Sequence, residues 1–391
     1  MARILVVGKY YPPAHGGIET STRLISEALG AHHQICALTF NHERGSCREN
    51  LGGIDIIRCG VAATLCAQPL SLSFAGHIFR GRWDVIYFHA PNVFASFFLL
   101  LRYLLFREKA QLVVFHHMDI HGRRVLRGLA LWLYGALTRR AAAVIVTSRK
   151  NRVVSRDLKG VTRCVAIPLG IDPDDWQIDA DERDSAREWR RTLAGNAPVV
   201  GFVGRHARYK GLDILVQAIA RLPGVHAFVA GDGPQRAGCE AQAKALGIGD
   251  RVHFLGHVTQ AEKRRMLSAI DVFAFPSTEI TEAFGISQLE AMMAGAPVVA
   301  SDLPTGVTDL AIDGRTALLV RPNGPEDLAR ALKRILVDPA LGRVLAGEAG
   351  RHVRTQFTAD RMGERHVRLV HALLSPAGSG HAALEPGLLR S

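Results

Sequence analysis

Short apolar stretches recur along most of the chain, and segments with helical periodicity separate them. These stretches are ILVVG, VIYF, LVVF, AVIVTS, VVGFVG, HAFVAG and VFAF. Strands that are apolar on both faces are typical of parallel sheets covered by helices, because the crossover between two parallel strands is usually a helix. The alternation therefore predicts an α/β fold built on parallel sheets.

The length of the chain indicates that this plan occurs twice. A chain of 391 residues, 48% of them apolar, exceeds one ordinary domain and can bury two cores. We expect a first domain at residues 1–172 and a second at residues 197–350, with a polar linker region at residues 173–196. The tail at residues 375–391 is small, polar and contains Gly and Pro, which predicts disorder.

The net charge of +12 implies an anionic partner: nucleic acid, anionic lipid or a phosphate-bearing substrate. No nucleic-acid reading module is evident, so we expect no nucleic-acid partner. The cationic residues are instead interleaved with apolar residues between Phe94 and Arg152. Within this region an apolar stretch with Trp132 and Tyr134 is flanked by arginines, namely Arg123, Arg124, Arg127, Arg139 and Arg140.

A helix of this composition can lie in a membrane interface, with its aromatic side chains at headgroup level and its arginines on anionic lipid. The apolar and basic segment 94–107 favours the same interpretation. The alternative is a surface helix that packs on the sheet with solvated ends. We expect peripheral binding to an anionic membrane surface.

The sequence favours a cytoplasmic location, on the inner face of the cell membrane. The N-terminal apolar run is too short for a signal-peptide core, and Arg102 interrupts the longest apolar run before it reaches the roughly 18 residues of a spanning helix. The 6 cysteines show no C-x-x-C pair or metal-ligand spacing, so we expect reduced thiols.

The stretch Asp271–Pro304 combines a strand, a loop with Glu282, a helix with Glu290, and a second strand. The first N–H groups of a helix lack intrahelical partners and its N-terminus is positive, so this loop predicts an anion site. The two carboxylates are expected on the order of 10 Å apart, which suits the two ends of an extended ligand. Two alternatives remain: Ser287 and Glu290 fit a capping box, and Glu282 fits a solvated loop acid.

Two cations bracket the loop after the strand VVGFVG. Arg205 follows Gly204 at the strand end, and Lys210 precedes Gly211 and the next helix. Cations at a sheet edge are what a bound diphosphate needs, although each residue alone is more typical of an ordinary surface. The next strand ends at Gly231 and Gly233.

The first half of the chain offers weaker candidates. Gly16 and Gly17 follow the first strand, where glycine lets backbone N–H groups approach a ligand; the alternative is a tight turn. The spacing is not G-x-G-x-x-G, which weakens a dinucleotide interpretation. His116, His117 and Asp119 end another strand, and ligands of open α/β folds bind at that edge.

Three motifs resemble one family. The segment Glu282-Ala-Phe-Gly-Ile-Ser-Gln-Leu-Glu290, followed by Ala-Met, is similar to the Glu-x7-Glu signature of retaining glycosyltransferases of family 4. FVGR-x4-KG-x-D and PPxxGGxE resemble the same family. The resemblance implies a GT-B fold, with two Rossmann-like parallel-sheet domains facing a cleft and a C-terminal helix at residues 351–374 that crosses back to the first domain.

The resemblance also implies a role for each candidate. Arg205 and Lys210 would contact the donor diphosphate, Glu282 and His117 the donor sugar, and Glu290 the ribose; His116 is an extra residue beside His117. The implied catalytic residues are Arg205, Lys210, Glu282 and His117. The implied substrate-binding residues are Gly16, Gly17, Asp119, Gly204, Gly231, Gly233, Phe284, Gly285, Ile286 and Glu290.

The implied reaction moves a hexose of mannose or glucose type from a GDP- or UDP-sugar to a polyprenyl-linked, glycolipid or glycan acceptor, with retention. We expect no cofactor and no metal, since two cations and a helix end already hold the diphosphate. The alternatives are a nucleotide-sugar epimerase or phosphorylase on the same architecture, and a non-catalytic nucleotide-sugar binder.

Overall fold

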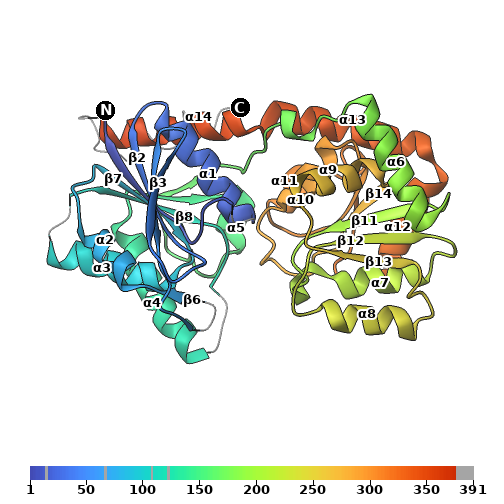
Figure 1. The fold of residues 1–391 in the computed structure, drawn as a ribbon, viewed down its shortest axis with the longest axis horizontal. Coiled ribbons are helices and arrows are strands. Elements are labelled where there is room, and N and C mark those ends of the chain that lie inside the picture. Colours follow the sequence, from blue (N-terminus) through green and yellow to red (C-terminus); the bar gives the residue numbers. More distant parts are fainter. Residues whose placement is uncertain (14–15, 66–67, 107–108, 121–123, 376–391) are drawn as a thin grey trace. The chain divides into compact units, whose positions relative to one another are not determined.

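The computed structural model describes residues 1–13, 16–65, 68–106, 109–120 and 124–375. They form two compact units, one of Met1–Gly170 with the described residues from Ala359 on, and one of Ile171–Thr358. Each unit is a largely parallel sheet with helices on its faces (Figure 1). The α/β class and the two sheets predicted from the alternation are confirmed.

The first unit contains a sheet of 8 strands in the order β10-β9-β8-β7-β1-β2-β4-β3 within the described residues. The strands are β1 Arg3–Val7, β2 Gln34–Phe40, β3 Cys47–Leu51, β4 Ile54–Cys59, β7 Val85–Ala90, β8 Gln111–His116, β9 Ala143–Val146 and β10 Cys164–Ala166. Only β3 runs antiparallel to its neighbour in this sheet. Strands β5 Ala63–Leu65 and β6 Gln68–Leu70 form a separate antiparallel pair.

The helices of this unit are α1 Gly17–Gly30, α2 Leu72–Phe79, α3 Val93–Leu105, α4 Arg124–Arg140, α5 Arg149–Val154 and α14 Ala359–Leu374. From β1 the chain first builds the sheet outward through β2 and β4, and then returns to β7 on the other side. The topological switch point, where ligands of open α/β sheets bind, is therefore at the carboxyl ends of β1 and β7.

The second unit contains 6 parallel strands in the order β13-β12-β11-β14-β15-β16. They are β11 Val199–Val203, β12 His226–Ala230, β13 Val252–Gly256, β14 Val272–Phe275, β15 Val298–Ser301 and β16 Leu318–Val320. The helices are α6 Ala180–Ala194, α7 Leu212–Ala220, α8 Arg236–Ala245, α9 Gln260–Ala269, α10 Ile286–Met293, α11 Val307–Leu310, α12 Pro325–Val337 and α13 Pro339–Gln356, with short 3₁₀ turns η1 Asp174–Trp176 and η2 Arg208–Lys210. Its switch point is between β11 and β14.

The region predicted as a linker, residues 173–196, is a folded part of the second unit. Helix α6 begins with a capping box in which Asp179 and Glu182 bond each other's backbone N–H groups. Arg190 then binds the carboxylate of Asp271 at 2.7 Å, and Trp176 of η1 is only 3% exposed. The region is polar because most of α6 faces solvent, although one face packs on α9.

The C-terminal helix also differs from the expected range 351–374. Residues up to Gln356 continue α13 in the second unit, and a separate helix, α14, begins at Ala359. Helix α14 belongs to the first unit because its apolar face packs on α1, with Met362, Leu369 and Val370 buried. The return to the first unit was expected; the helix that makes it is shorter. Of the tail predicted to be disordered, residues 376–391 lie outside the described residues.

Candidate functional site

Three loops converge at the switch point of the second unit: residues 204–211 after β11, 231–234 after β12, and 276–285 after β14. Gly231 has a φ of 114°, and a Cβ added there would lie 2.1 Å from the carbonyl oxygen of Gly204. Neither the conformation nor the space admits another residue type without strain. The predicted residues Gly204 and Gly231 therefore hold two of the loops against each other, and Gly233 lies in the same loop beside His206.

Lys210 and Glu282 meet across this switch point. The Lys210 Nζ lies 2.6 Å from the Glu282 Oε2, and their side chains are 13% and 8% exposed. Ser277 donates a hydrogen bond of 2.9 Å to the same carboxylate oxygen. Burial, the largest single influence, lowers the pKa of Lys210, but the charge and hydrogen bond of Glu282 together with the charges of Tyr209 and Glu290 leave that pKa raised. Lys210 is therefore a cation fixed by its ion pair with Glu282. The interpretation of Glu282 as a solvated loop acid is wrong, because its side chain is buried.

Glu290 lies on the inward face of α10 and is 8% exposed. The Lys263 Nζ of α9 lies 2.5 Å from its Oε1. Burial raises the pKa of Glu290, and Lys263 and Lys210 oppose that rise. The capping-box alternative is wrong, because the helix cap is Gly285 and makes no side-chain hydrogen bond, while Ser287 lies inside the helix.

The segment Phe284-Gly285-Ile286 forms the start of α10. Gly285 has a φ of 92°, and an added Cβ would lie 2.6 Å from Cζ of Phe275. Phe284 is buried against Phe357, at 5.9 Å between ring centroids, and Ile286 is the first helical residue. The glycine turn thus directs the first N–H groups of an eight-residue helix toward the switch point.

Arg205 differs from Lys210 in being exposed, and the described residues give it no ion pair. The next residue, His206, is fully buried, and neither ring nitrogen has a hydrogen-bond partner among the described residues. Burial lowers the pKa of His206, so this ring is neutral near pH 7. The sequence analysis missed His206, as it missed Lys263 and Ser277, since no local pattern marks them.

In the first unit, Gly16 and Gly17 form the N-terminus of α1 at the carboxyl edge of the sheet. Residues 14 and 15 of this turn lie outside the described residues. Strands β1 and β8 are both neighbours of β7, so the carboxyl ends of β1 and β8 are about 10 Å apart along the sheet edge. Gly17 is the first residue of the helix, so its N–H has no intrahelical partner.

His117 follows β8 and is buried beside His89 of β7. The His117 Nε2 and the His89 Nδ1 lie 2.9 Å apart, and the two rings stack with 5.2 Å between centroids. Burial, followed by the charges of His89 and His116, lowers the pKa of His117 well below its usual value. His117 is therefore a neutral ring, whose nitrogens can donate or accept a hydrogen bond.

His116 is occupied by the unit's own side chains. Its Nδ1 lies 2.7 Å from the Tyr134 hydroxyl and its Nε2 lies 3.2 Å from Asp119 Oδ1. Asp119 also accepts hydrogen bonds from the Ser155 hydroxyl and from the Arg156 N–H. The structure therefore pairs Asp119 with His116, and it leaves His117 as the better candidate for a ligand.

Tyr134 was expected at a membrane headgroup level and is instead 1% exposed. Its hydroxyl is bound by His116, which anchors α4 to the end of β8. Arg127 is 37% exposed and contacts its own unit: its Nε donates to the Ile120 carbonyl at 2.9 Å and its Nη2 lies 3.7 Å from Asp157. Arg123 lies outside the described residues.

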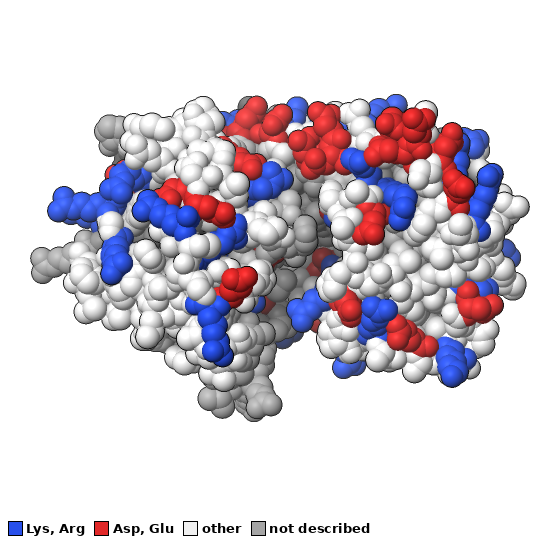
Figure 2. Space-filling model, viewed as in Figure 1, with Lys and Arg blue, Asp and Glu red and all other residues white. Residues whose placement is uncertain are grey.

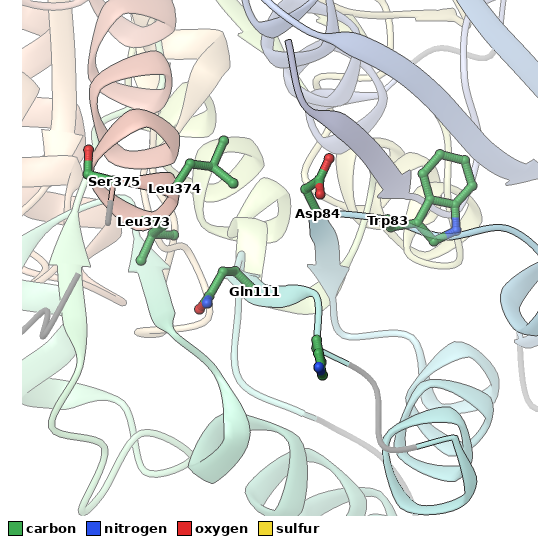
Figure 3. A pocket seen from close by; sticks show the side chains of 7 residues that line it. Trp83, Asp84, Gln111, Leu373, Leu374 and Ser375 are labelled. Atoms are coloured by element: carbon green, nitrogen blue, oxygen red, sulfur yellow. The ribbon is translucent and has the colours of Figure 1, made fainter. Parts of the chain in front are cut away.

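A cavity of about 380 Å³ lies at the opposite edge of the first sheet, where β7 and β8 begin. Figure 3 shows the end of α14 facing Asp84 and Gln111 across it. Ligands of open α/β sheets bind at the carboxyl ends of the strands, so this cavity is not part of the candidate site. Across the described residues, no group of 3 or more His, Cys, Asp or Glu could hold a metal ion.

Comparisons with known proteins identify the family. Residues 15–175 match the model of "Glycosyltransferase Family 4", and residues 185–352 match that of "Glycosyl transferases group 1". The D-rhamnosyltransferase WbpZ of Pseudomonas aeruginosa is 32% identical over 306 residues, which cover 76% of this chain and 77% of the relative. The chain belongs to glycosyltransferase family 4. It is an enzyme of the glycosyltransferase class.

Other relatives differ in how much of this glycosyltransferase they match. An O-antigen chain mannosyltransferase C of Escherichia coli is 29% identical over 95% of this chain and 99% of its own. A 2-deoxystreptamine glucosyltransferase of Streptomyces kanamyceticus is 36% identical over 59% of each chain. The alignment with the second of these thus covers less than two thirds of either protein.

Solved structures support the GT-B fold of this family 4 enzyme. The sucrose-phosphate synthase of Thermosynechococcus elongatus matches with a TM-score of 0.78 at 22% identity, over 95% of this chain and 99% of the other. HepE of Anabaena, in complex with UDP-glucose, matches with a TM-score of 0.76 at 21% identity, over 95% of this chain and 100% of the other. At these identities the likeness concerns the fold, and the predicted GT-B class is confirmed.

Proposed function

We propose that this glycosyltransferase moves a hexose from a nucleotide-sugar donor to a lipid-linked or glycan acceptor, with retention at the anomeric carbon. The observation that carries the proposal is the pairing of Lys210 with Glu282 at the switch point of the second unit. One residue provides a fixed positive charge for a diphosphate, and the other provides a carboxylate for a sugar hydroxyl. The first turn of α10 adds N–H groups beside them.

Charge stabilisation is the main catalytic contribution in this proposal. As the bond from the anomeric carbon to the diphosphate breaks, negative charge grows on the departing phosphate oxygen. Arg205 and Lys210 stabilise that charge, and a preorganised donor in a partly buried site is effective because it needs no reorganisation. Lys210 is preorganised by Glu282 and by the rings of Tyr209 and Phe275, whose centroids lie 5.5 and 5.4 Å from its Nζ.

The surroundings of Glu282 favour an orienting role over a nucleophilic one. Its Oε2 is bound by both Lys210 and Ser277. A carboxylate whose lone pairs are engaged by a cation and a hydroxyl is a poor nucleophile, although it still accepts a hydrogen bond from a sugar hydroxyl. Retention is then achieved by attack of the acceptor on the same face from which the diphosphate leaves.

The donor we propose is a UDP- or GDP-hexose. The similar proteins include one solved with UDP-glucose and others named for glucosyl, mannosyl and rhamnosyl transfer. The names O-antigen chain mannosyltransferase and lipopolysaccharide core biosynthesis glycosyltransferase favour a role in cell-surface polysaccharide or glycolipid synthesis. The acceptor we propose is therefore a polyprenyl-linked or glycolipid sugar.

A thermal-shift screen of UDP-, GDP- and ADP-hexoses tests the donor. A ligand at 100 times its Kd adds about 2.7 kcal/mol of stability. The stabilising donor is then incubated with a lipid extract, and the released nucleotide and the anomeric configuration of the product are measured. Transfer with inversion would contradict the proposal. Release of a free epimer would support an epimerase instead, and binding without turnover would support a binding protein.

The enzyme is also proposed to act without a metal ion or cofactor. Arg205, Lys210 and the N-terminus of α10 provide the positive charge that a metal would otherwise supply. EDTA should therefore leave turnover unchanged. Loss of turnover in EDTA with recovery in Mn²⁺ would show a metal-dependent reaction.

We further propose peripheral binding to the cytoplasmic leaflet through α3 and α4. These helices pack side by side, and they expose Phe97, Leu104 and Leu105 of α3 and Leu129 and Trp132 of α4 by 49 to 64%. Figure 2 shows a largely uncharged surface over α2 and α3 with Lys and Arg side chains around it. Arg139 and Arg140 are exposed at the end of α4, where anionic headgroups would meet them.

The surface proposed for membrane contact lies on α3 and α4. Among the described residues, none of the helices is both long and apolar enough to span a membrane. Apolar side chains that insert into the interface, with cations on anionic lipid, favour a reversible attachment. Such an attachment keeps the enzyme beside a lipid-linked acceptor.

A further inference from the structure

Lys263 forms an ion pair with Glu290. None of the roles proposed above explains why a lysine is present at this position. Lys263 lies on α9, 27 residues before Glu290, and its Nζ is 2.5 Å from Glu290 Oε1. The two side chains are 18% and 11% exposed. An ion pair so shielded keeps a fixed geometry, because water competes weakly for either partner.

Trp176 holds Lys263 in turn. The Lys263 Nζ lies 5.2 Å from the centroid of the Trp176 ring, within the range of a cation–π contact. Trp176 is 3% exposed, so its ring is fixed by packing. The contact joins the 3₁₀ turn η1, at the beginning of the second unit, to helix α9.

These contacts form one charge array inside the second unit. Lys263 pairs with Glu290, and Lys210 pairs with Glu282, so cations and carboxylates alternate. Burial is the largest influence on the pKa of Lys210, and the charges of Glu282 and Glu290 both raise it. Burial raises the pKa of Glu290, and Lys263 opposes this rise. Without Lys263, Glu290 would lose its nearest cation.

We propose that Lys263, backed by Trp176, is a positioning residue that fixes Glu290 as a carboxylate aimed at a hydroxyl of the donor's ribose. Lys263 binds Oε1, so that oxygen of the carboxylate is occupied. Oε2 is then the atom that accepts the hydroxyl hydrogen bond. The inference rests on the proposed function, because it assumes that a nucleoside diphosphate occupies this site.

This role differs from a contribution to stability alone. A structural ion pair would affect every nucleotide equally when it is removed. A positioning residue affects only the part of binding that Glu290 provides. The difference in affinity between UDP and 2′- or 3′-deoxy-UDP, or the matching GDP analogues, isolates that part.

The experiment measures, by calorimetry on the full chain, the Kd of the nucleoside diphosphate and of its deoxy analogues. In the unchanged protein, loss of the recognised hydroxyl should weaken binding by about ten-fold or more, since a hydrogen bond to a buried charge is left unmade. In Lys263→Met this ratio should fall toward one, and binding should weaken further as the pH is lowered, because Glu290 without its cation gains a proton more readily. Lys263→Arg keeps the charge and should restore most of the ratio.

Two matched variants complete the test. Lys244→Met removes an exposed lysine of α8 and should leave the ratio unchanged. Trp176→Phe keeps an aromatic ring in the packed position and should reduce the ratio partly. In turnover, Lys263→Met should raise the donor KM while kcat stays close to that of the unchanged protein.

The outcomes separate this inference from the proposed function. Failure of the unchanged protein to bind any nucleoside diphosphate would overturn the proposed function. Binding by the unchanged protein, with the same ribose-to-deoxyribose ratio in Lys263→Met, would overturn the positioning role alone. Circular dichroism and the unfolding transition of each variant show whether a loss of nucleotide binding comes from misfolding. If Lys263→Met misfolds, the affinity ratio of Lys263→Arg tests the positioning role in its place.

Discussion

Lys210 Nζ and Glu282 Oε2 lie 2.6 Å apart. The residue proposed to bind the diphosphate and the residue proposed to bind the sugar therefore form an ion pair with each other. A bound diphosphate would share Lys210 with Glu282, because the ammonium group has three N–H donors. Glu282 would therefore keep Lys210 in place while its remaining donors bind phosphate.

The first prediction concerns Glu282→Gln. The amide is neutral and binds Lys210 more weakly, so Lys210 becomes more available to phosphate. We expect the nucleoside diphosphate to bind as tightly as before or a few-fold more tightly, while kcat falls by about 10² because the sugar is oriented less well. Calorimetry and initial rates measure the two effects; weaker nucleotide binding would contradict the sharing of Lys210 between Glu282 and phosphate.

The two cations should respond differently to Ala substitution. Each of Arg205→Ala and Lys210→Ala should reduce kcat by about 10² to 10³. Lys210→Ala should also destabilise the fold by about 3 to 5 kcal/mol, because it leaves Glu282 buried without a cation. Arg205 is exposed, and its substitution should change stability by less than about 0.5 kcal/mol.

Arg208→Ala is the control for the two cations, since Arg208 is an exposed arginine of η2. Its kcat and its stability in denaturant should match those of the unchanged protein. An unchanged kcat in both Arg205→Ala and Lys210→Ala would refute their assignment to the diphosphate.

The loop packing predicts opposite effects for two glycines. Gly231→Ala places a Cβ 2.1 Å from the Gly204 carbonyl oxygen at a φ of 114°, and should cost at least about 1 to 3 kcal/mol of stability together with donor affinity. Gly238→Ala adds a methyl group to open space on α8 and should gain about 0.5 to 1 kcal/mol. Denaturant unfolding of both variants checks the difference; equal stability would contradict the described loop contact.

The buried histidines of the first unit predict acid sensitivity. Burial lowers the pKa of His89 and of His366 from 6.5 to about 3. Between pH 6.5 and about 3, these two histidines bind protons in the unfolded chain but not in the folded unit. Their contribution to the free energy of unfolding is therefore complete above about pH 6.5 and is lost as the pH falls toward 3. The free energy of unfolding, measured in denaturant at a series of pH values, should fall over this range.

A double substitution tests the source of this slope. Tyr87 and His366 hydrogen bond each other, so Tyr87→Phe with His366→Phe removes both polar partners together. The pH dependence should become shallower in this variant. His257→Gln, at an exposed histidine, should leave the slope unchanged; a slope that persists in the double variant would assign it to other groups.

The membrane prediction depends on two exposed side chains of α4. Leu129→Ser with Trp132→Ala removes apolar surface that is 55% and 61% exposed, and should weaken co-sedimentation with anionic vesicles several-fold. Binding should rise with the anionic lipid fraction and fall at about 1 M salt, where the Debye length is about 3 Å.

The control for vesicle binding is Val344→Ser, at a residue of α13 that is 63% exposed in the second unit. It should bind vesicles as the unchanged protein does. Binding that ignores both lipid charge and salt, or an absence of binding to anionic vesicles, would assign α3 and α4 to a different partner.

The sequence by itself determined the class of fold and the local geometry of the loops. Apolar runs between helical segments specify buried parallel strands, because burial on both faces requires apolar residues at every position. The end of α10 near Gly295 and the glycine turn before the helix could likewise be predicted, since they depend on neighbouring residues. The capping box of Asp179 and Glu182 is an equally local signal, and it could have identified α6 in place of a linker.

Only the tertiary structure decided which residues meet. Lys210 and Glu282 are 72 residues apart, and they pair because β11 and β14 are neighbours in the sheet, an order that packing determines. His366 reaches Tyr87 across 279 residues because α14 packs on the first unit. Such contacts depend on where whole elements dock, and the periodicity of a segment records which face is apolar but not which surface covers it.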